Sequence, residues 1–257
     1  MLSSSWVLNN MNKEKIRKHY TEERQIRRRI ELATKGFTGK LITHNFKKIV
    51  NILAPYRKGE KIADIGCGFG YLMHFLPDYV RVCGVDLSLL ALTVAGSFRS
   101  FSGVQTDAHN LPFREGTFDK LFCINLTPHL VDLKGALKEC FRILKPNGSA
   151  MINFLNKYGL ANLPFTILKI KRGLYFRNGL MTPSPQNSFS YHEMKKLVEE
   201  AGFTILETYG LGITFPYFLL GQTIPWVAHK VTDYMVKNQD SPLIKLLSNA
   251  ILFKIKK

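Results

Sequence analysis

Apolar positions in the middle of the chain fall into short continuous runs, separated by stretches with helical spacing. Five runs of the kind that form buried strands occupy residues 61–66, 80–87, 103–108, 118–126 and 149–155. Segments with helical periodicity lie at 71–77, 88–97 and 131–144. This alternation of strands and helices favours a parallel sheet that is covered by helices on both faces.

Boundary signals extend the pattern toward the C-terminus. The sequence KPNG at 145–148 predicts the end of the helix before it, because it contains a proline and a glycine. Ser190 and Glu193 have capping-box spacing at the start of a further helix, which Gly202 ends. Two more strands are predicted at 203–210 and 250–257. The fold class is therefore α/β, with a seven-stranded sheet.

The N-terminal part has a different pattern. Apolar stripes at 12–35 and 41–53 predict two helices before the first strand. We therefore expect an N-terminal helical cap at 1–44 and a main domain at 45–257. Two insertions in the main domain, 156–189 and 211–249, are rich in aromatic residues. They would form a lid over the sheet, either as a simple cap or as an apolar tunnel with a basic rim.

The distribution of charge along the chain bears on its binding partners. The 257 residues carry a formal net charge of +17. Lys and Arg outnumber Asp and Glu by 14 to 5 in residues 1–60 and by 13 to 6 in 151–257, whereas 61–150 is nearly balanced at 9 to 8. Such flanks indicate an anionic partner, namely a membrane surface, a nucleic acid or an acidic substrate, although a solvated basic face without a partner is the alternative.

Composition and spacing exclude several classes of protein. With 46% hydrophobic and 21% charged residues, the chain resembles a globular protein, and no apolar run reaches the roughly 18 residues that span a bilayer. The N-terminus lacks the features of a secretory signal. Four widely spaced cysteines, which favour buried free thiols over a metal site, are Cys67, Cys83, Cys123 and Cys140. We expect a cytoplasmic protein without a metal, with peripheral membrane contact as an option.

A glycine loop follows the first strand. The sequence IADIGCGFGYL (62–72) places glycine at 66, 68 and 70, directly after Asp64. Alternate glycines after a strand let the backbone turn tightly and approach a ligand. The spacing is not that of the dinucleotide fingerprint, because position 71 is tyrosine. A purely structural turn is the other interpretation of this loop.

Acids at the ends of the next two strands favour a ligand site. Asp86 ends the second predicted strand, 20 residues after Gly66, where a carboxylate can accept hydrogen bonds from ribose hydroxyls. Asp107 ends the third, where it could accept a hydrogen bond from an adenine amino group. Ligands of doubly wound sheets bind at the carboxyl ends of the strands. Together with the glycine loop, these acids predict a nucleoside site.

The segments IADIGCGFG, VCGVDLS, VQTDAHNLPF, FDKLFCINLTPHL and FRILKPNG resemble, in order, the motifs of class I S-adenosylmethionine (SAM)-dependent methyltransferases of the quinone and small-molecule branch. The resemblance is close over 45–155 and looser over 190–209. It implies a Rossmann-like sheet with SAM as cofactor and S-adenosylhomocysteine as product.

The resemblance also implies cofactor contacts. Residues on the methionine side are Asp64, Gly66, Cys67, Gly68, Gly70 and Asn125. Residues on the adenosine side are Asp86, Leu87, Asp107 and Ala108. Asp64 would bind the amino group of SAM or brace the loop, and Asn125 would complete the methionine pocket and face the substrate. Asp86 would hold the ribose with Leu87 against the adenine, and Tyr20 is a candidate for closing over the cofactor.

Methyl transfer from a sulfonium is an in-line displacement, so positioning supplies much of the catalysis. His129, after the fourth strand, is a candidate general base, with packing in a loop as the alternative. The aromatic, basic insertions favour a small-molecule or lipid-like acceptor. Their basic residues would suit an anionic acceptor. The alternatives are an RNA methyltransferase that binds phosphates through the basic flanks and a SAM-binding module without catalysis.

Overall fold

The computed structural model describes residues 36–159, 187–211 and 241–257, and the single positions 226, 230, 234 and 238. The predicted helix at 12–35, with Tyr20, and most of both insertions lie outside the described residues. No helix in the part of the chain that the structure describes is long and apolar enough to cross a membrane.

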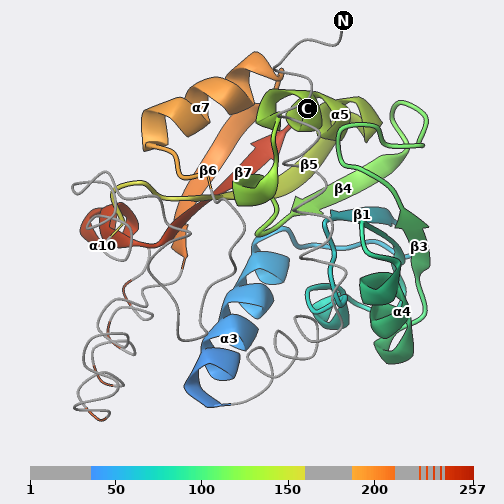
Figure 1. Ribbon diagram of the computed structural model, residues 1–257, viewed down its shortest axis with the longest axis horizontal. Helices are drawn as coiled ribbons and strands as arrows, with labels where there is room; N and C mark the ends of the chain where they lie inside the picture. Colours follow the sequence, from blue (N-terminus) through green and yellow to red (C-terminus); the bar gives the residue numbers. More distant parts are fainter. Residues whose placement is uncertain are drawn as a thin grey trace, which may run out of the picture.

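Seven strands form one twisted sheet (Figure 1). They are β1 (Lys61–Ile65), β2 (Arg81–Asp86), β3 (Ser102–Gln105), β4 (Phe118–Cys123), β5 (Leu144–Leu155), β6 (Thr204–Leu211) and β7 (Ala250–Lys256). Their order in the sheet is β3-β2-β1-β4-β5-β7-β6. The first five are parallel, while β7 runs antiparallel to both β5 and β6. The carboxyl ends of β1, β2 and β4 therefore meet at one edge of the sheet.

Helices cover both faces of the sheet, which confirms the predicted Rossmann-like α/β class. The α-helices are α3 (Gly36–Ile52), α4 (Leu89–Phe98), α5 (Leu133–Ile143), α7 (Tyr191–Glu200) and α10 (Pro242–Leu247), and two single-turn 3₁₀ helices are η1 (Met73–Phe75) and η2 (Thr127–His129). Figure 1 shows α5 and α7 on one face and α3 on the other.

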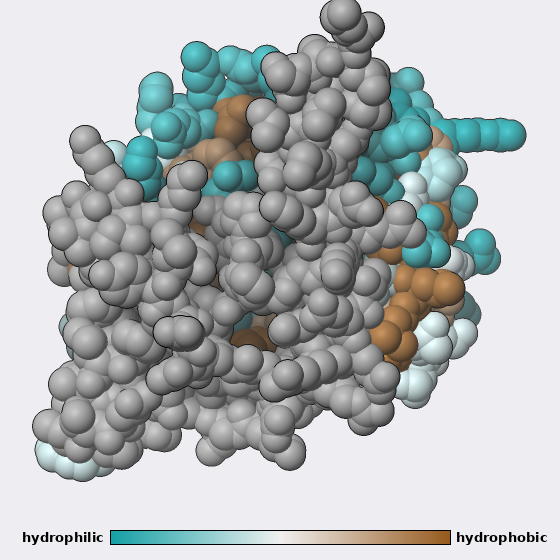
Figure 2. Space-filling model, in the orientation of Figure 1, coloured by the Kyte–Doolittle hydropathy of each residue, from teal (hydrophilic) through white to brown (hydrophobic). Residues whose placement is uncertain are grey.

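The core is divided by the sheet into two clusters. Side chains of β5 alternate between them, because Phe154 packs with residues of α5 and α7, whereas Met151 packs with Ile49 of α3. Helix α4 contributes Leu92 and Ala95 to the second cluster. Leu89 and Phe98, the first and last residues of α4, are exposed apolar side chains, and Figure 2 shows apolar surface over this helix. Neither residue belongs to the two described core clusters.

Several predicted boundaries are wrong, each for a local reason. The helix predicted at 71–77 is only the turn η1, because Pro77 has no N–H to donate to the Met73 carbonyl, which binds the Arg99 guanidinium instead. The third strand ends at Gln105 and not at 108, since the chain turns at Asp107. The fourth ends at Cys123 and not at 126, since Asn125 takes a left-handed conformation with φ of 60°.

Two other helix and strand boundaries also differ from the predicted ones. Helix α3 begins at Gly36 and continues past position 44, and the division into 1–44 and 45–257 stays a prediction. The KPNG sequence follows the end of α5 but lies inside β5, which begins at Leu144 and not at 149. Pairing with β4 is irregular there, and Asn147 with its φ of 64° donates its N–H to the carbonyl of Lys257. The Ser190–Glu193 capping box is confirmed.

Candidate functional site

The glycine loop turns sharply at the carboxyl end of β1. Gly66, Gly68 and Gly70 have φ of 74°, 52° and 71°, a region that side chains disfavour. A Cβ at Gly66 would lie 2.9 Å from Leu126 Cδ1, so the loop packs directly against the chain that follows β4. A Cβ at Gly68 would meet no atom of the described part of the chain within 4 Å. The backbone at Gly68 is therefore open to a ligand, while Gly66 keeps the loop closely packed.

Asp86 ties the glycine loop to the end of β2. Its Oδ2 accepts the backbone N–H of Gly68 at 2.9 Å, and its Oδ1 accepts that of Ser88 at 2.9 Å. The backbone N–H groups of Gly66 and Cys67 both donate to the Val85 carbonyl. These bonds hold the carboxylate of Asp86 beside the open backbone of Gly68, as the sequence predicted.

Asp64 is a buried carboxylate in β1, only 3% exposed. Its Oδ2 is fully buried and has no hydrogen-bond partner among the residues that the structure describes. Burial, and to a smaller extent the nearby charge of Asp86, raises the pKa of Asp64 to about 7. Burying a carboxyl oxygen without a hydrogen-bond partner costs free energy of folding, unless a cation or a hydrogen-bond donor reaches it. The residue type and its burial therefore fit an ammonium or sulfonium group.

Asp107 lies two residues beyond β3, in a turn. Its Oδ1 accepts the backbone N–H of His109 at 3.0 Å and contacts Nδ1 of the same imidazole. Nε2 of His109 in turn accepts the backbone N–H of Asp132 at 3.3 Å. This role of His109 is not among the sequence-based predictions, although the Asp-x-His spacing signals it. The imidazole therefore fixes the carboxylate of Asp107. Ala108, which lies between Asp107 and His109 in the sequence, is buried.

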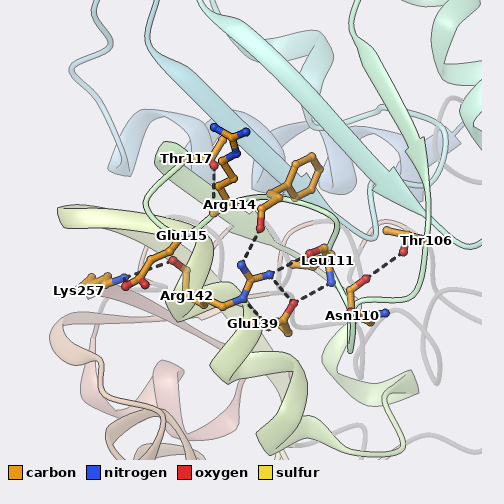
Figure 3. Close-up of polar contacts among 10 residues, drawn as sticks. Thr106, Asn110, Leu111, Arg114, Glu115, Thr117, Glu139, Arg142 and Lys257 are labelled. Carbon is orange, nitrogen blue, oxygen red and sulfur yellow. Dashed lines mark hydrogen bonds and ion pairs between the residues drawn. The ribbon is translucent and has the colours of Figure 1, made fainter.

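A salt bridge on α5 anchors the loop that carries Asp107 (Figure 3). Glu139 binds Arg142 through two contacts of 2.7 and 2.8 Å and accepts the backbone N–H of Leu111 at 2.8 Å. The Arg142 guanidinium also donates to the carbonyls of Leu111 and Phe113. Arg142 holds the pKa of Glu139 below its usual range. The loop between β3 and β4 is therefore anchored by the side chains of Glu139 and Arg142 on α5.

The chain after β4 turns beside the glycine loop. Asn125 is exposed, and its backbone N–H and side chain both bond Asn153 of β5. Leu126 packs on Gly66, as described above. His129 ends the single turn η2, where its backbone N–H donates to the Leu126 carbonyl. The structure thus brings Asn125, Asp64 and Asp86 to one sheet edge, with His129 one turn further along the chain.

The four cysteines are buried free thiols, as predicted. Burial raises the pKa of Cys67 and Cys83, and the hydrogen bond between Cys123 and Cys140 raises the pKa of Cys123. The thiols of Cys67, Cys83 and Cys123 are therefore neutral at physiological pH.

Comparison with known proteins places this geometry in context. A family described as methyltransferase domain matches residues 63–152. An uncharacterised protein of Methanocaldococcus jannaschii is 26% identical over 212 residues, which cover 76% of this chain and 83% of that protein. A ubiquinone biosynthesis O-methyltransferase of Cupriavidus pinatubonensis is 28% identical over 159 residues, which cover 57% of this chain and 64% of that enzyme.

A solved structure shares the fold. The phosphoethanolamine N-methyltransferase 2 of Haemonchus contortus, in complex with phosphomonomethylethanolamine and S-adenosylhomocysteine, superposes with a TM-score of 0.65 at 16% identity. The match covers 94% of this chain and 60% of that one.

Proposed function

We propose that this SAM-dependent methyltransferase, whose class I methyltransferase domain includes residues 63–152, methylates an O, N or C atom of a small-molecule or lipid-like acceptor. SAM is its cofactor. The assignment of individual residues to SAM and the nature of the acceptor are the parts we propose.

The observation that carries the site assignment is the unpartnered carboxyl oxygen of Asp64. It is buried behind the glycine loop and close enough to Asp86 for each charge to affect the other. SAM carries an ammonium and a sulfonium at its methionine end, so it brings cations to such a place. A structural turn alone gives no reason to bury an unsatisfied acid.

In this proposal each residue has a positioning task. Gly66, Gly68 and Gly70 admit the methionine moiety, and Asp64 receives its amino group. Asp86 accepts hydrogen bonds from the ribose hydroxyls, because the backbone N–H groups of Gly68 and Ser88 hold its carboxylate at the end of β2 beside the glycine loop.

The remaining residues complete the adenosine and acceptor sides. Leu87 packs on the adenine, while Asp107 and Ala108 read its edge from the turn that His109 fixes. SAM supplies a methyl group on an activated leaving group. The chain therefore has to align the acceptor and exclude water, and His129 would remove a proton only from a poorly ionised acceptor.

The names of the similar enzymes favour a small acceptor. The Cupriavidus enzyme is named for ubiquinone biosynthesis, and the Haemonchus enzyme holds a phosphorylated amine. The basic flanks suit an anionic acceptor or a membrane surface. The net charge of +17 is the observation that favours the second candidate, methylation of RNA.

Transfer of a radiolabelled methyl group from SAM into a host extract tests the proposal. The extract is then separated into organic, aqueous small-molecule, RNA and protein fractions. Label in either small-molecule fraction, absent with Asp86→Ala, is the expected result. Label in RNA would replace the leading acceptor class by the second candidate, and transfer by Asp86→Ala equal to that of the natural chain would contradict the site assignment.

A further inference from the structure

Two asparagines lock together at the carboxyl edge of the sheet. Asn153 lies in β5, is 3% exposed, and is 28 residues away from Asn125 along the chain. The backbone N–H of Asn125 donates to Asn153 Oδ1 at 2.6 Å, and Asn153 Nδ2 donates to Asn125 Oδ1 at 2.8 Å. Thr127 Oγ1 donates to the Asn153 carbonyl at 2.7 Å. The turn after β4 is thus held by one buried residue.

This pair fixes which end of the Asn125 carboxamide faces outward. A backbone N–H can only donate, so the atom of Asn153 that it meets must be the carbonyl oxygen. The other end of the Asn153 carboxamide is then the NH₂ group, and it must meet an acceptor, which is Asn125 Oδ1. The NH₂ group of Asn125 is left to point elsewhere, and no described residue accepts a hydrogen bond from it.

Asn125 has a left-handed backbone conformation, with φ of 60°. Asparagine adopts this region more readily than most residues other than glycine, and it lets the chain turn sharply after β4. The two bonds to Asn153 hold this turn in one orientation. The turn and its buried partner therefore place an exposed pair of N–H donors next to Leu126, which packs against Gly66.

We propose that these donors bind the carboxylate of the methionine moiety of SAM, and that Asn153 is the positioning residue that aims them. The proposal rests on the proposed function and specifies one part of the site. Its chemistry is complementary to the two acids nearby. Asp64 and Asp86 attract the cationic groups of a zwitterionic ligand but repel its carboxylate, so the carboxylate needs neutral or positive donors.

Calorimetric titration with two ligands tests this inference. SAM is compared with decarboxylated SAM, which has the same adenosine, sulfonium and amine but no carboxylate. The variants are Asn153→Asp, Asn125→Ala and the double variant. Asn153→Asp keeps an acceptor for the Asn125 N–H but loses the donor, and its charge repels Asn125 Oδ1, so the carboxamide turns over. The matched control is Asn156→Ala, which removes a buried asparagine that bonds the carbonyls of Leu246 and Ser248.

We expect each single variant to weaken SAM roughly 10- to 100-fold, the loss of charge-assisted hydrogen bonds, and to leave decarboxylated SAM within about twofold. The double variant should bind SAM no more weakly than Asn125→Ala, because the two residues act as a unit. Asn156→Ala should change both ligands equally or not at all. In the natural chain, SAM should bind more tightly than decarboxylated SAM by a similar factor.

Equal losses for the two ligands in Asn153→Asp would show that Asn153 supports only the fold and would overturn the inference. Unchanged SAM affinity would overturn it too. If the natural chain binds both ligands equally well, the carboxylate is not bound by these donors, although the SAM site stands. If it binds neither, the proposed site assignment itself fails.

Discussion

The buried carboxyl of Asp64 should make SAM affinity depend on pH. With a pKa of about 7 in the empty protein, Asp64 is mostly protonated near pH 6 and mostly ionised near pH 8. A cationic ligand favours the ionised form, so affinity should rise with pH. From the fractions ionised, binding at about pH 6 should be about tenfold weaker than at about pH 8.

Other groups near Asp64 do not produce the same profile. The neighbouring charge is that of Asp86, which is partly exposed and accepts two backbone N–H groups. The thiols of Cys67 and Cys123 also face Asp64, and their raised pKa values keep them neutral throughout this range. Asp64 is therefore the group whose ionisation changes between the two conditions.

Isothermal titration at several pH values is the assay, with Asp64→Asn as the variant. The variant should bind SAM more weakly near pH 8 and lose the pH dependence. Methylthioadenosine, which lacks both the amine and the sulfonium charge, is the matched ligand and should show no dependence in either protein. Equal SAM affinity of the natural chain near pH 6 and pH 8, or an unchanged profile in Asp64→Asn, would refute the reasoning.

The same substitution should affect stability in the opposite sense. The pKa of Asp64 in the folded chain lies above its ordinary value of 3.8, so the folded state binds more protons between these values. Stability therefore falls as pH rises from about 4 to about 7, by up to about 4 kcal/mol. Asp64→Asn should raise the melting temperature near pH 8 and change it little near pH 4. A lower melting temperature of the variant near pH 8 would contradict this.

Three further changes test other parts of the site and fold. Asp86→Ala should weaken SAM by about 3 kcal/mol in calorimetry, since it removes two ribose bonds and frees the Gly68 N–H; an unchanged dissociation constant would count against the ribose assignment. Arg142→Ala should cost about 2 to 3 kcal/mol in urea unfolding, because it leaves the Leu111 and Phe113 carbonyls and Glu139 without their donor; a loss under about 0.5 kcal/mol would show that the loop needs no anchor. Ser190→Ala should cost about 1 kcal/mol in the same assay through loss of the capping box, whereas SAM affinity should not change.

The sequence was sufficient wherever a residue's place follows from its distance to a strand end. Asp64 and Asp86 lie within or directly at the end of predicted strands, and parallel strands bring such residues to one edge. The antiparallel direction of β7 could not be predicted in this way. It depends on how the chain returns through 241–249 to pair with both β5 and β6, which local hydrophobic patterns do not record.

The sequence was insufficient wherever a role depends on a distant partner. In the sequence, Asn153 is one polar residue inside an apolar strand. Its burial is explained by its bonds to Asn125, which the sequence does not show. The turn of Asp107 needed His109 and the Asp132 backbone, 23 residues from that imidazole. Likewise, that Asp64 lacks a partner is a property of everything packed around it. Apart from the local contact between Asp107 and His109, these facts are set by tertiary contacts, so local spacing could not reveal them.

Two buried polar groups at this edge are in opposite states, and the contrast has a physical meaning. Asn153 is satisfied by its neighbours, which makes it a rigid support. Asp64 retains an oxygen with no partner, which makes it an acceptor for something the fold does not provide. A rigid pair of donors on Asn125 and an acid that ionises when a cation arrives are together complementary to a ligand with one carboxylate and one ammonium group. The amino-acid end of SAM has both, and this match supports the proposed SAM site over a site for a nucleotide whose charges are all negative.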